Sequence, residues 1–275
     1  MSPARGSSGR PSLVLCVDIG NSYTVLGLLT GPPDGREVVA HWRVATDERR
    51  TADEWAVLLR GLLDGLGGGA QPTGIAVCAT VPVVLAEWRE MLTAHYADLP
   101  SVVVEPGVRT GIPVLMDNPR EVGADRIMNA LAAARLYGGP AIVVDFGTAT
   151  TFDVVSPAGQ YVGGAIAAGV EISLQALGQR GAQLRQVELK RPRSVIAKNT
   201  VEALQSGMLF GLAAQVEGLV TRMIAELGAD AGDVRVIATG HAAPLVLGEC
   251  SCFTDHSPWL TLLGLGLAFD RNASD

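Results

Sequence analysis

Two short stretches of the sequence place an aspartate and a glycine directly after an apolar run and follow them with small polar residues. The first, CVDIGNSYTVL, carries Asp18 and Gly20, and the second, VVDFGTATTFD, carries Asp145 and Gly147. In an Asp-X-Gly hairpin the carboxylate lies at the end of a strand, while backbone N–H groups and hydroxyl side chains of the turn face one point. The glycine also lets the backbone approach a ligand closely. Such a turn can bind phosphate, and its carboxylate can hold a metal ion against that phosphate.

Either turn alone is also explained as a tight hairpin that its aspartate merely caps. Two matched turns in one chain favour a different interpretation, in which each half of the molecule supplies one turn. We therefore expect Asp18 and Asp145 to face each other across a cleft that grips a polyphosphate from both sides.

The segments that must position these turns alternate between apolar strands and helices with 3.6-residue apolar spacing, which predicts an α/β fold. The expected strands are residues 13–19, 24–30, 37–44, 74–82, 101–107, 140–147, 148–156, 159–169 and 233–240. The expected helices are residues 46–66, 85–96, 125–138, 170–184, 199–227 and 258–272.

The length of 275 residues suits one large domain or two modest ones. We expect a disordered tail at residues 1–12, a first domain at 13–115 and a second domain at 116–275, with the seam between residues 111 and 140. No low-complexity linker divides the two halves.

Composition and charge exclude several classes of protein. The chain is 48% hydrophobic and 18% charged, with a net charge of −7. It therefore lacks the excess of basic residues that is typical of proteins that bind nucleic acids or membrane surfaces. No apolar run reaches the roughly 18–20 residues of a membrane span, and the N-terminus lacks the apolar core of a signal peptide. The four cysteines, at positions 16, 78, 250 and 252, fit neither a zinc site nor a disulfide framework. We therefore expect free thiols and a reducing cytoplasm.

The twin turns resemble those of the actin-like ATPase and acetate/sugar-kinase superfamily, whose duplicated ribonuclease H-like domains carry one phosphate hairpin each. Four stretches give a closer likeness: DNPREVGADRIMNA (117–130), DFGTATTFD, GGAIAAG and KNTVEALQSG. Together they resemble type III pantothenate kinase, the first committed enzyme of coenzyme A synthesis, from about residue 13 to residue 273. The resemblance implies two actin-like domains with a cleft between them. It also implies ATP-dependent phosphorylation of pantothenate to 4'-phosphopantothenate.

Phosphorylating a primary alcohol needs an acceptor for the hydroxyl proton, and the resemblance assigns that role to Asp125 in GADR. Arg126 offers a planar fork that suits the carboxylate of pantothenate. Without the surrounding motif, Asp125 and Arg126 would be explained as an ion pair at a helix start. The resemblance implies these pantothenate contacts: Met116, Gly123, Ala124, Asp125, Arg126 and Thr200. It implies these ATP contacts: Asp18, Ile19, Gly20, Asn21, Ser22, Tyr23, Thr24, Val25, Thr148 and Gly240.

Cofactors and partners follow from the same resemblance. Asp18 is expected to support Mg²⁺, and Asp145 is expected to hold a monovalent cation, potassium or ammonium. A monovalent ion would balance the second carboxylate without competing for the octahedral magnesium site. Family members build the acceptor site across a subunit interface, so a homodimer is implied. We expect no nucleic-acid partner and no membrane.

Five positions depart from the pattern of the family: Tyr23, Met116, Ala168, His241 and Gly266. Tyr23 and His241 add bulk beside the expected nucleotide, and the turn at His241 is expected to change shape because histidine adopts a positive φ less readily than glycine. A surface histidine that points to water is the alternative. These departures leave open a paralogue that phosphorylates another small alcohol, and a non-catalytic regulator that binds nucleotide.

Overall fold

The chain folds into two compact units. The computed structural model describes residues 13–32, 35–67, 71–105, 107–180 and 187–273. Contacts define unit 1 as Met1–Arg109 with Leu265–Asp275, and unit 2 as Thr110–Gly264. The domains expected from the sequence share most residues with these units, but they assign Leu265–Asp275 to the second half. This segment belongs to unit 1 because Phe269 packs on Gly74 so closely that a Cβ there would clash.

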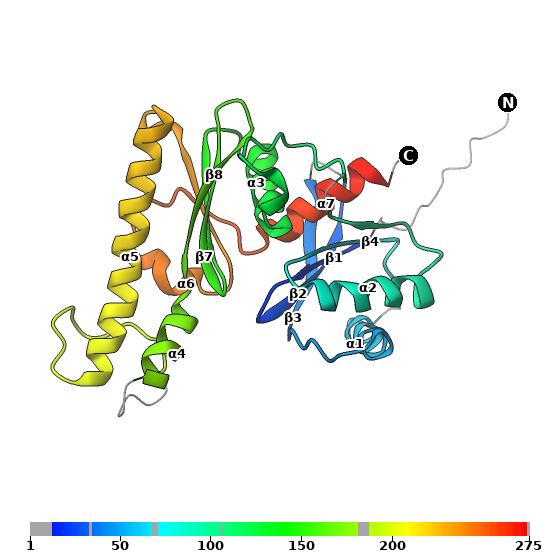
Figure 1. Ribbon diagram of the computed structural model, residues 1–275, viewed down its shortest axis with the longest axis horizontal. Coiled ribbons are helices and arrows are strands. Elements are labelled where there is room, and N and C mark those ends of the chain that lie inside the picture. The colour runs from blue at the N-terminus through cyan, green and yellow to red at the C-terminus, as the bar shows by residue number, and fades with distance from the viewer. Residues whose placement is uncertain (1–12, 33–34, 68–70, 106, 181–186, 274–275) are drawn as a thin grey trace. The chain divides into compact units, whose positions relative to one another are not determined.

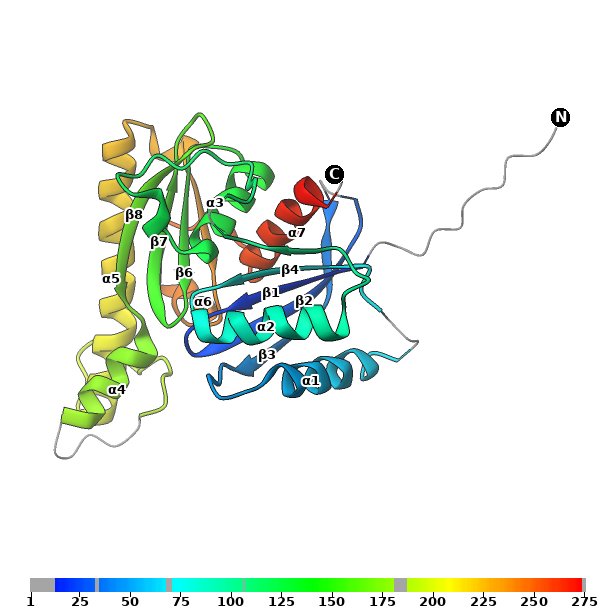
Figure 2. The ribbon, with the colours of Figure 1, turned by 45° about the vertical axis from the view of Figure 1, so that its right-hand side comes forward.

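Unit 1 is a five-stranded mixed sheet with two helices on one face. Its elements are β1 (Val14–Ile19), β2 (Tyr23–Thr30), β3 (Glu37–Ala45), α1 (Ala52–Asp64), β4 (Gly74–Ala79), α2 (Pro82–His95) and β5 (Ser101–Val103). The strand order is β3-β2-β1-β4-β5. Strand β1 pairs antiparallel with β2 and parallel with β4. Figure 2 shows α1 and α2 side by side along this sheet.

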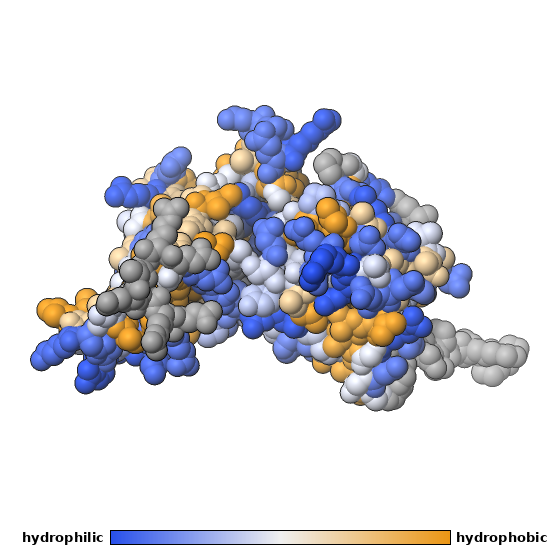
Figure 3. Space-filling view, turned by 60° about the horizontal axis from the view of Figure 1, so that its bottom comes forward, coloured by the Kyte–Doolittle hydropathy of each residue, from blue (hydrophilic) through white to orange (hydrophobic). Residues whose placement is uncertain are grey.

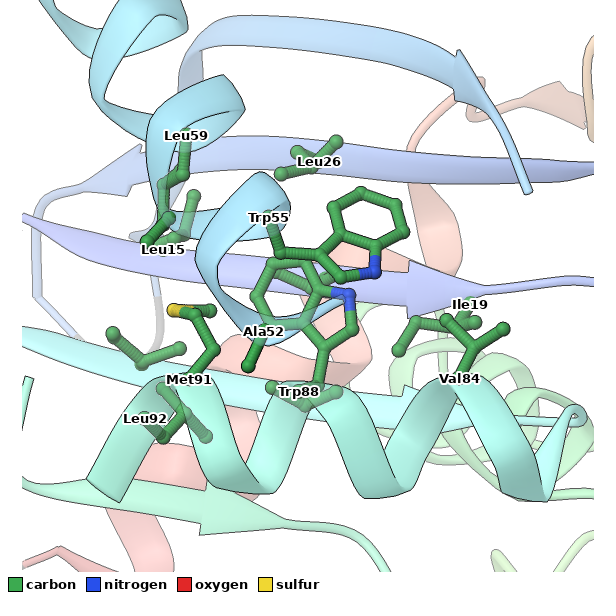
Figure 4. Packing of buried hydrophobic residues seen from close by; sticks show 14 of the residues in the cluster. Leu15, Ile19, Leu26, Ala52, Trp55, Leu59, Val84, Trp88, Met91 and Leu92 are labelled. Atoms are coloured by element: carbon green, nitrogen blue, oxygen red, sulfur yellow. The ribbon is translucent and has the colours of Figure 1, made fainter. Parts of the chain in front are cut away.

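Local sequence explains where these two helices begin. Thr51 caps α1 through a reciprocal capping box with Glu54. Pro82, which was expected to stop a strand, opens α2 instead, because proline suits the first turn of a helix. The helices meet through Trp55 and Trp88, whose ring centroids lie 5.2 Å apart in the core of unit 1 (Figure 4).

Unit 2 repeats this plan. Its elements are α3 (Ala124–Leu136), β6 (Ala141–Phe146), β7 (Ala149–Val155), β8 (Tyr161–Ala168), α4 (Val170–Arg180), α5 (Thr200–Leu227), β9 (Arg235–Thr239), α6 (Ala243–Val246), β10 (Asp255–His256) and the start of α7 (Leu260–Asn272). The strand order is β10-β9-β6-β7-β8. Strand β6 pairs antiparallel with β7 and parallel with β9, as β1 does with β2 and β4. The duplicated actin-like α/β fold is therefore confirmed.

The two faces of the sheet in unit 2 differ in chemistry. One face carries Ile142, Val144 and Phe152, which form the apolar core with α5. Since successive side chains of a strand point to opposite faces, Asp145 and Asp153 belong to the other face, beside α3. Figure 1 shows α5 and α3 on opposite sides of these strands.

Helix α5 is the one part of the described chain that has the length and apolar composition of a membrane span. Its apolar residues do not form an uninterrupted run of that length, because Glu202, Gln205 and Glu217 lie among them. The helix is nevertheless part of the folded unit, because Leu209, Val216 and Val220 pack in the core. Its Glu217 accepts hydrogen bonds from the backbone and the hydroxyl of Ser251, both at 2.8 Å.

Candidate active site

The turn between β1 and β2 contains the first aspartate–glycine motif. The strands pair up to Ile19 and Thr24, which leaves a short turn that begins with Gly20. The Gly20 N–H donates to the carbonyl of Tyr23 at 3.0 Å. Thr46 braces the turn from the end of β3, because its Oγ1 donates to the carbonyl of Gly20 at 2.7 Å and lies 2.9 Å from Oγ1 of Thr24. The segment expected to bind ATP is thus a hairpin fixed by one backbone bond of its own and by the hydroxyl of Thr46.

The side chains of this hairpin have close neighbours. The thiol of Cys78, which is opposite Asp18 in the parallel register of β1 and β4, donates to Oδ1 of Asp18 at 3.4 Å. The guanidinium carbon of Arg43 lies 4.5 Å from the ring centroid of Tyr23. The bulky ring at position 23 therefore has a cation stacked on it.

The turn between β6 and β7 contains the second motif. Its Thr148 carbonyl accepts a hydrogen bond from the N–H of Gly169 at 3.1 Å. Gly240 follows the neighbouring strand β9 with a φ of +86°, and a Cβ there would clash with Oδ1 of Asp145. Unit 2 thus brings together three predicted residues: Asp145, Thr148 and Gly240. Only glycine combines this positive φ with this close approach.

Asp145 is held by a chain of polar side chains. The amide nitrogen of Asn129, on α3, donates to its Oδ2 at 2.9 Å. The hydroxyl of Thr261, on α7, in turn donates to Oδ1 of Asn129 at 2.8 Å. Burial raises the pKa of Asp145 to about 6, although the bond from Asn129 lowers it. The carboxylate is oriented, but its charge is poorly solvated.

Asp125 lies in the first turn of α3 with one oxygen unsatisfied. Its Oδ1 is buried and has no hydrogen-bond partner among the residues that the structure describes. Burial raises the pKa of Asp125, while the backbone N–H and the charge of Arg126 lower it. A buried acceptor without a partner is costly in a folded protein, so this oxygen is a candidate to meet a ligand.

Arg126 is anchored by the sheet below α3. Its Nε donates to Oδ1 of Asp153 at 2.6 Å, and one terminal nitrogen donates to the carbonyl of Phe152 at 3.2 Å. The hydroxyl of Tyr161 donates to the same Oδ1 of Asp153 at 3.2 Å. Asp153 is fully buried, and the Arg126 side chain is 12% exposed. The ion pair of Arg126 is therefore made with Asp153, and not with Asp125 as the alternative explanation of the GADR motif would have it.

The remaining residues expected to contact pantothenate divide into two sets. Gly123 is the N-cap of α3 and Ala124 its first residue, so both adjoin Asp125. Met116 lies near β8, since a Cβ at Gly163 would be 3.4 Å from its sulfur. Thr200 does not join them. It is exposed at the start of α5, behind an Asn199 cap, on the face of the sheet opposite α3.

The other departures from the family pattern have structural explanations. His241 keeps a negative φ, because the positive φ of this turn belongs to Gly240, and its Nε2 lies 3.2 Å from the carboxylate of Glu171. The exposed ring of His241 therefore contacts an acidic side chain rather than water alone. A Cβ at Gly266 would be 3.0 Å from both Arg36 and Leu29, so this glycine permits close packing in unit 1. Ala168 is exposed at the end of β8.

Sequence reasoning missed four residues of this site: Asn129, Asp153, Tyr161 and Thr261. Two of them left a signal. Asn129 follows Asp125 by four residues, so it lies on the same helix face, and Asp153 is a charge inside an apolar strand, two positions after Thr151. Nothing in the sequence indicates that Thr261 would reach Asn129 from a distant helix.

Metal binding by protein groups alone has little support in the described part of the chain. No group of three or more His, Cys, Asp or Glu side chains is arranged there to hold a metal ion. Mg²⁺ commonly binds to one or two carboxylates together with substrate phosphates and water. A single carboxylate beside the Gly20 turn, as at Asp18, has the chemistry to hold an ion that arrives with a nucleotide.

Comparisons with known proteins identify a family that this chain resembles over most of its length. The family model for type III pantothenate kinase matches residues 14–222. A type III pantothenate kinase of Nocardioides sp. is 72% identical over 263 residues, which cover 94% of this chain and 99% of the relative. The corresponding protein of Streptomyces griseus is 62% identical over 267 residues, covering 95% and 99%.

Two solved structures share the fold at low sequence identity. The ethanolamine utilization protein EutJ from Carboxydothermus hydrogenoformans has a TM-score of 0.53 and 18% identity, covering 95% of this chain and 91% of its own. Component A of (R)-2-hydroxyglutaryl-CoA dehydratase from Acidaminococcus fermentans has a TM-score of 0.53 and 14% identity, covering 96% and 100%. These likenesses establish the fold alone.

Proposed function

The chain belongs to the type III pantothenate kinase family, and from this we propose how its residues share the family's reaction. It phosphorylates pantothenate in coenzyme A biosynthesis, with ATP as the donor. In this reaction the primary hydroxyl of pantothenate attacks the γ-phosphorus in line and loses its proton. The site therefore needs a proton acceptor and groups that stabilise the charge on the phosphates.

Asp125 is the proton acceptor in this proposal. The observation that carries it is the buried Oδ1, which no group in the described part of the chain satisfies. A substrate hydroxyl that donates to this oxygen would satisfy it and would be oriented for attack. The raised pKa of Asp125, caused by burial, also makes its carboxylate a stronger base than an exposed aspartate.

Arg126 binds the carboxylate of pantothenate, and its neighbours shape the rest of the acceptor site. The two described bonds of its guanidinium use Nε and one terminal nitrogen, out of five N–H donors. Gly123 and Ala124 line the start of α3, and Met116 supplies an apolar wall near β8.

The two hairpins bind the phosphates of ATP through Asp18–Val25 and Thr148, and Gly240 approaches the nucleotide. When bound, Mg²⁺ supplies positive charge to the phosphates, and Asp18 would hold it. Asp145 suits a monovalent cation, because burial raises its pKa to about 6 and a cation beside it would offset the missing solvation.

We extend the proposal to a cytoplasmic homodimer. Thr200 lies on the face of the sheet opposite α3, so it could contact pantothenate only in a partner subunit. Exposed apolar side chains near this helix support such an interface: Ile166, Ile172, Leu177, Val195, Ile196 and Val201. Figure 3 shows hydrophobic residues at the left-hand end of the molecule, where α4 and the segment before α5 lie. The four free thiols fit a reducing compartment.

The direct test measures product formation by the purified chain with ATP and pantothenate, with and without potassium. We expect phosphopantothenate and stimulation by potassium. Absence of product at millimolar substrates and high enzyme concentration would contradict the function. Potassium stimulation that persists in Asp145→Ala would mean that the cation lies elsewhere. A much higher kcat/KM for another small alcohol would identify a different acceptor.

A further inference from the structure

A buried carboxylate that the proposed reaction does not use lies under the start of α3. Asp153 has no exposed surface, and its Oδ1 accepts from Nε of Arg126 at 2.6 Å and from the hydroxyl of Tyr161 at 3.2 Å. Oδ2 lies 3.4 Å from the hydroxyl of Thr151. Aspartate is rarely this deeply buried unless it is paired, and here the partner is the guanidinium of Arg126.

The backbone around this pair is fitted to the guanidinium. Gly164 is opposite Asp153 in the antiparallel register of β7 and β8. A Cβ at Gly164 would clash with the carbonyl of Phe152, the same carbonyl that accepts from Arg126, and would lie 3.1 Å from a terminal nitrogen of Arg126. The Tyr161 ring centroid is 5.9 Å from the guanidinium carbon. Carboxylate, carbonyl, ring and glycine thus fix the plane of one guanidinium.

We propose that Asp153, oriented by Tyr161, is a positioning residue. It holds the Arg126 guanidinium in the plane that is needed to bind the carboxylate of the substrate. The inference rests on the proposed role of Arg126 in binding that carboxylate. Bidentate recognition of a carboxylate depends on the plane of the fork. Asp153 touches no substrate in this proposal and acts only through Arg126.

A purely structural role for the same ion pair makes a different prediction. Buried ion pairs often add little net stability compared with apolar groups, but removing one partner leaves an uncompensated charge. If Asp153 served only the fold, its loss would lower the melting temperature and would affect charged and uncharged substrates alike. If it positions Arg126, its loss would weaken binding of the carboxylate selectively.

The experiment compares pantothenate with an analogue whose terminal carboxylate is replaced by an uncharged primary alcohol. The measured quantity is the ratio of kcat/KM for pantothenate to kcat/KM for the analogue. For Asp153→Asn we expect this ratio to fall about 10- to 100-fold, since a misplacement of about 1 Å has effects of this size. The loss should come from KM for pantothenate, while KM for ATP stays unchanged. Tyr161→Phe, which keeps the packing, should reduce the ratio by a smaller factor.

Two control variants make the outcomes distinguishable. Asp270→Asn removes the acid of another buried arginine pair, Arg36–Asp270 in unit 1, and should leave the ratio unchanged. Arg126→Met should abolish the preference for pantothenate; if it does not, the proposed role of Arg126 fails. If Arg126→Met abolishes the preference but folded Asp153→Asn and Tyr161→Phe both keep it, the positioning role alone is overturned.

Discussion

At the scale of single residues, the site contains acids whose charged form is disfavoured by burial. Asp125 is the clearest, because its Oδ1 is buried without a partner and burial raises its pKa. Such groups persist where function needs them and commonly lower stability. Activity and stability should therefore respond in opposite directions when this acid is neutralised.

We predict that Asp125→Asn lowers kcat about 10²- to 10⁴-fold, the contribution of a positioned base, while ATP binding is largely kept. The melting temperature should rise by about 2–4 °C, because about 1 kcal/mol of unfavourable burial is removed. Turnover assays, nucleotide calorimetry and thermal melts measure the three quantities. Asp117→Asn, an exposed acid of the same segment, is the matched control. Equal losses of ATP binding and turnover would mean that Asp125 is structural.

The pH dependence of substrate preference reports on Asp153, because Asp145, whose pKa burial raises to about 6, acts on the nucleotide side in this proposal and affects both substrates equally. Burial raises the pKa of Asp153 to about 7 against the opposing charge of Arg126, with Asp125, Asp145 and Tyr161 as the other titratable groups around it. Asp153 therefore gains a proton as the pH falls through about 7, and its hold on Arg126 weakens.

We predict that the preference for pantothenate over its uncharged alcohol analogue declines as the pH is lowered from about 8 to about 6. Titration of Asp125 affects both substrates equally, so it cancels in the ratio of their kcat/KM values. In Asp153→Asn the ratio should be low and flat with pH. A wild-type ratio that is flat over this range would show that Asp153 stays charged throughout.

At the scale of elements, each hairpin is held in place by side chains that lie outside its turn. In unit 1 the brace is Thr46, whose Oγ1 bonds the carbonyl of Gly20 at 2.7 Å. We predict that Thr46→Val raises KM for ATP about fivefold, the equivalent of one hydrogen bond of about 1 kcal/mol, without changing KM for pantothenate. Initial-rate kinetics measure both constants. Thr73→Val, which removes a similar hydroxyl bonded to Leu13 just before β1, should change neither.

The sequence predicted most elements because local patterns determine them. Apolar runs located β1, β4, β6 and β9 to within a few residues, and capping residues located α1 and α5. The short strand β10 was missed, since two residues carry no periodicity, and its place depends on pairing with β9.

For the candidate site, the sequence predicted the two turns and the GADR motif. It did not predict which other side chains hold these residues in place. The Asp145–Asn129–Thr261 chain joins residues from three elements, and Thr261 is 132 positions from Asn129. Only the fold brings such residues together. Asp153 was within reach of sequence reasoning, because a buried charge in an apolar strand calls for a partner.

At the scale of the whole molecule, the C-terminal segment packs in unit 1, the unit that also contains the first strand of the chain. Leu265–Asp275 belongs to unit 1, and Asp270 makes a two-bond pair with Arg36, Nε to Oδ2 at 2.8 Å and the terminal nitrogen to Oδ1 at 2.5 Å. The side chains are 5% and 16% exposed for Arg36 and Asp270. This pair therefore links the first hairpin region of the sequence to its last helix.

We predict that Asp270→Asn lowers the free energy of unfolding of unit 1 by about 3 kcal/mol, because it leaves the Arg36 charge buried without compensation. Denaturant titration followed by tryptophan fluorescence measures it, since Trp42, Trp55 and Trp88 lie in unit 1 and only Trp259 lies in unit 2. Arg191→Ala breaks a pair whose arginine is 64% exposed and should cost less than about 1 kcal/mol. If the two variants lose the same amount, the C-terminal helix does not hold unit 1 together through this pair, and its apolar contacts, such as Phe269 on Gly74, must do so instead.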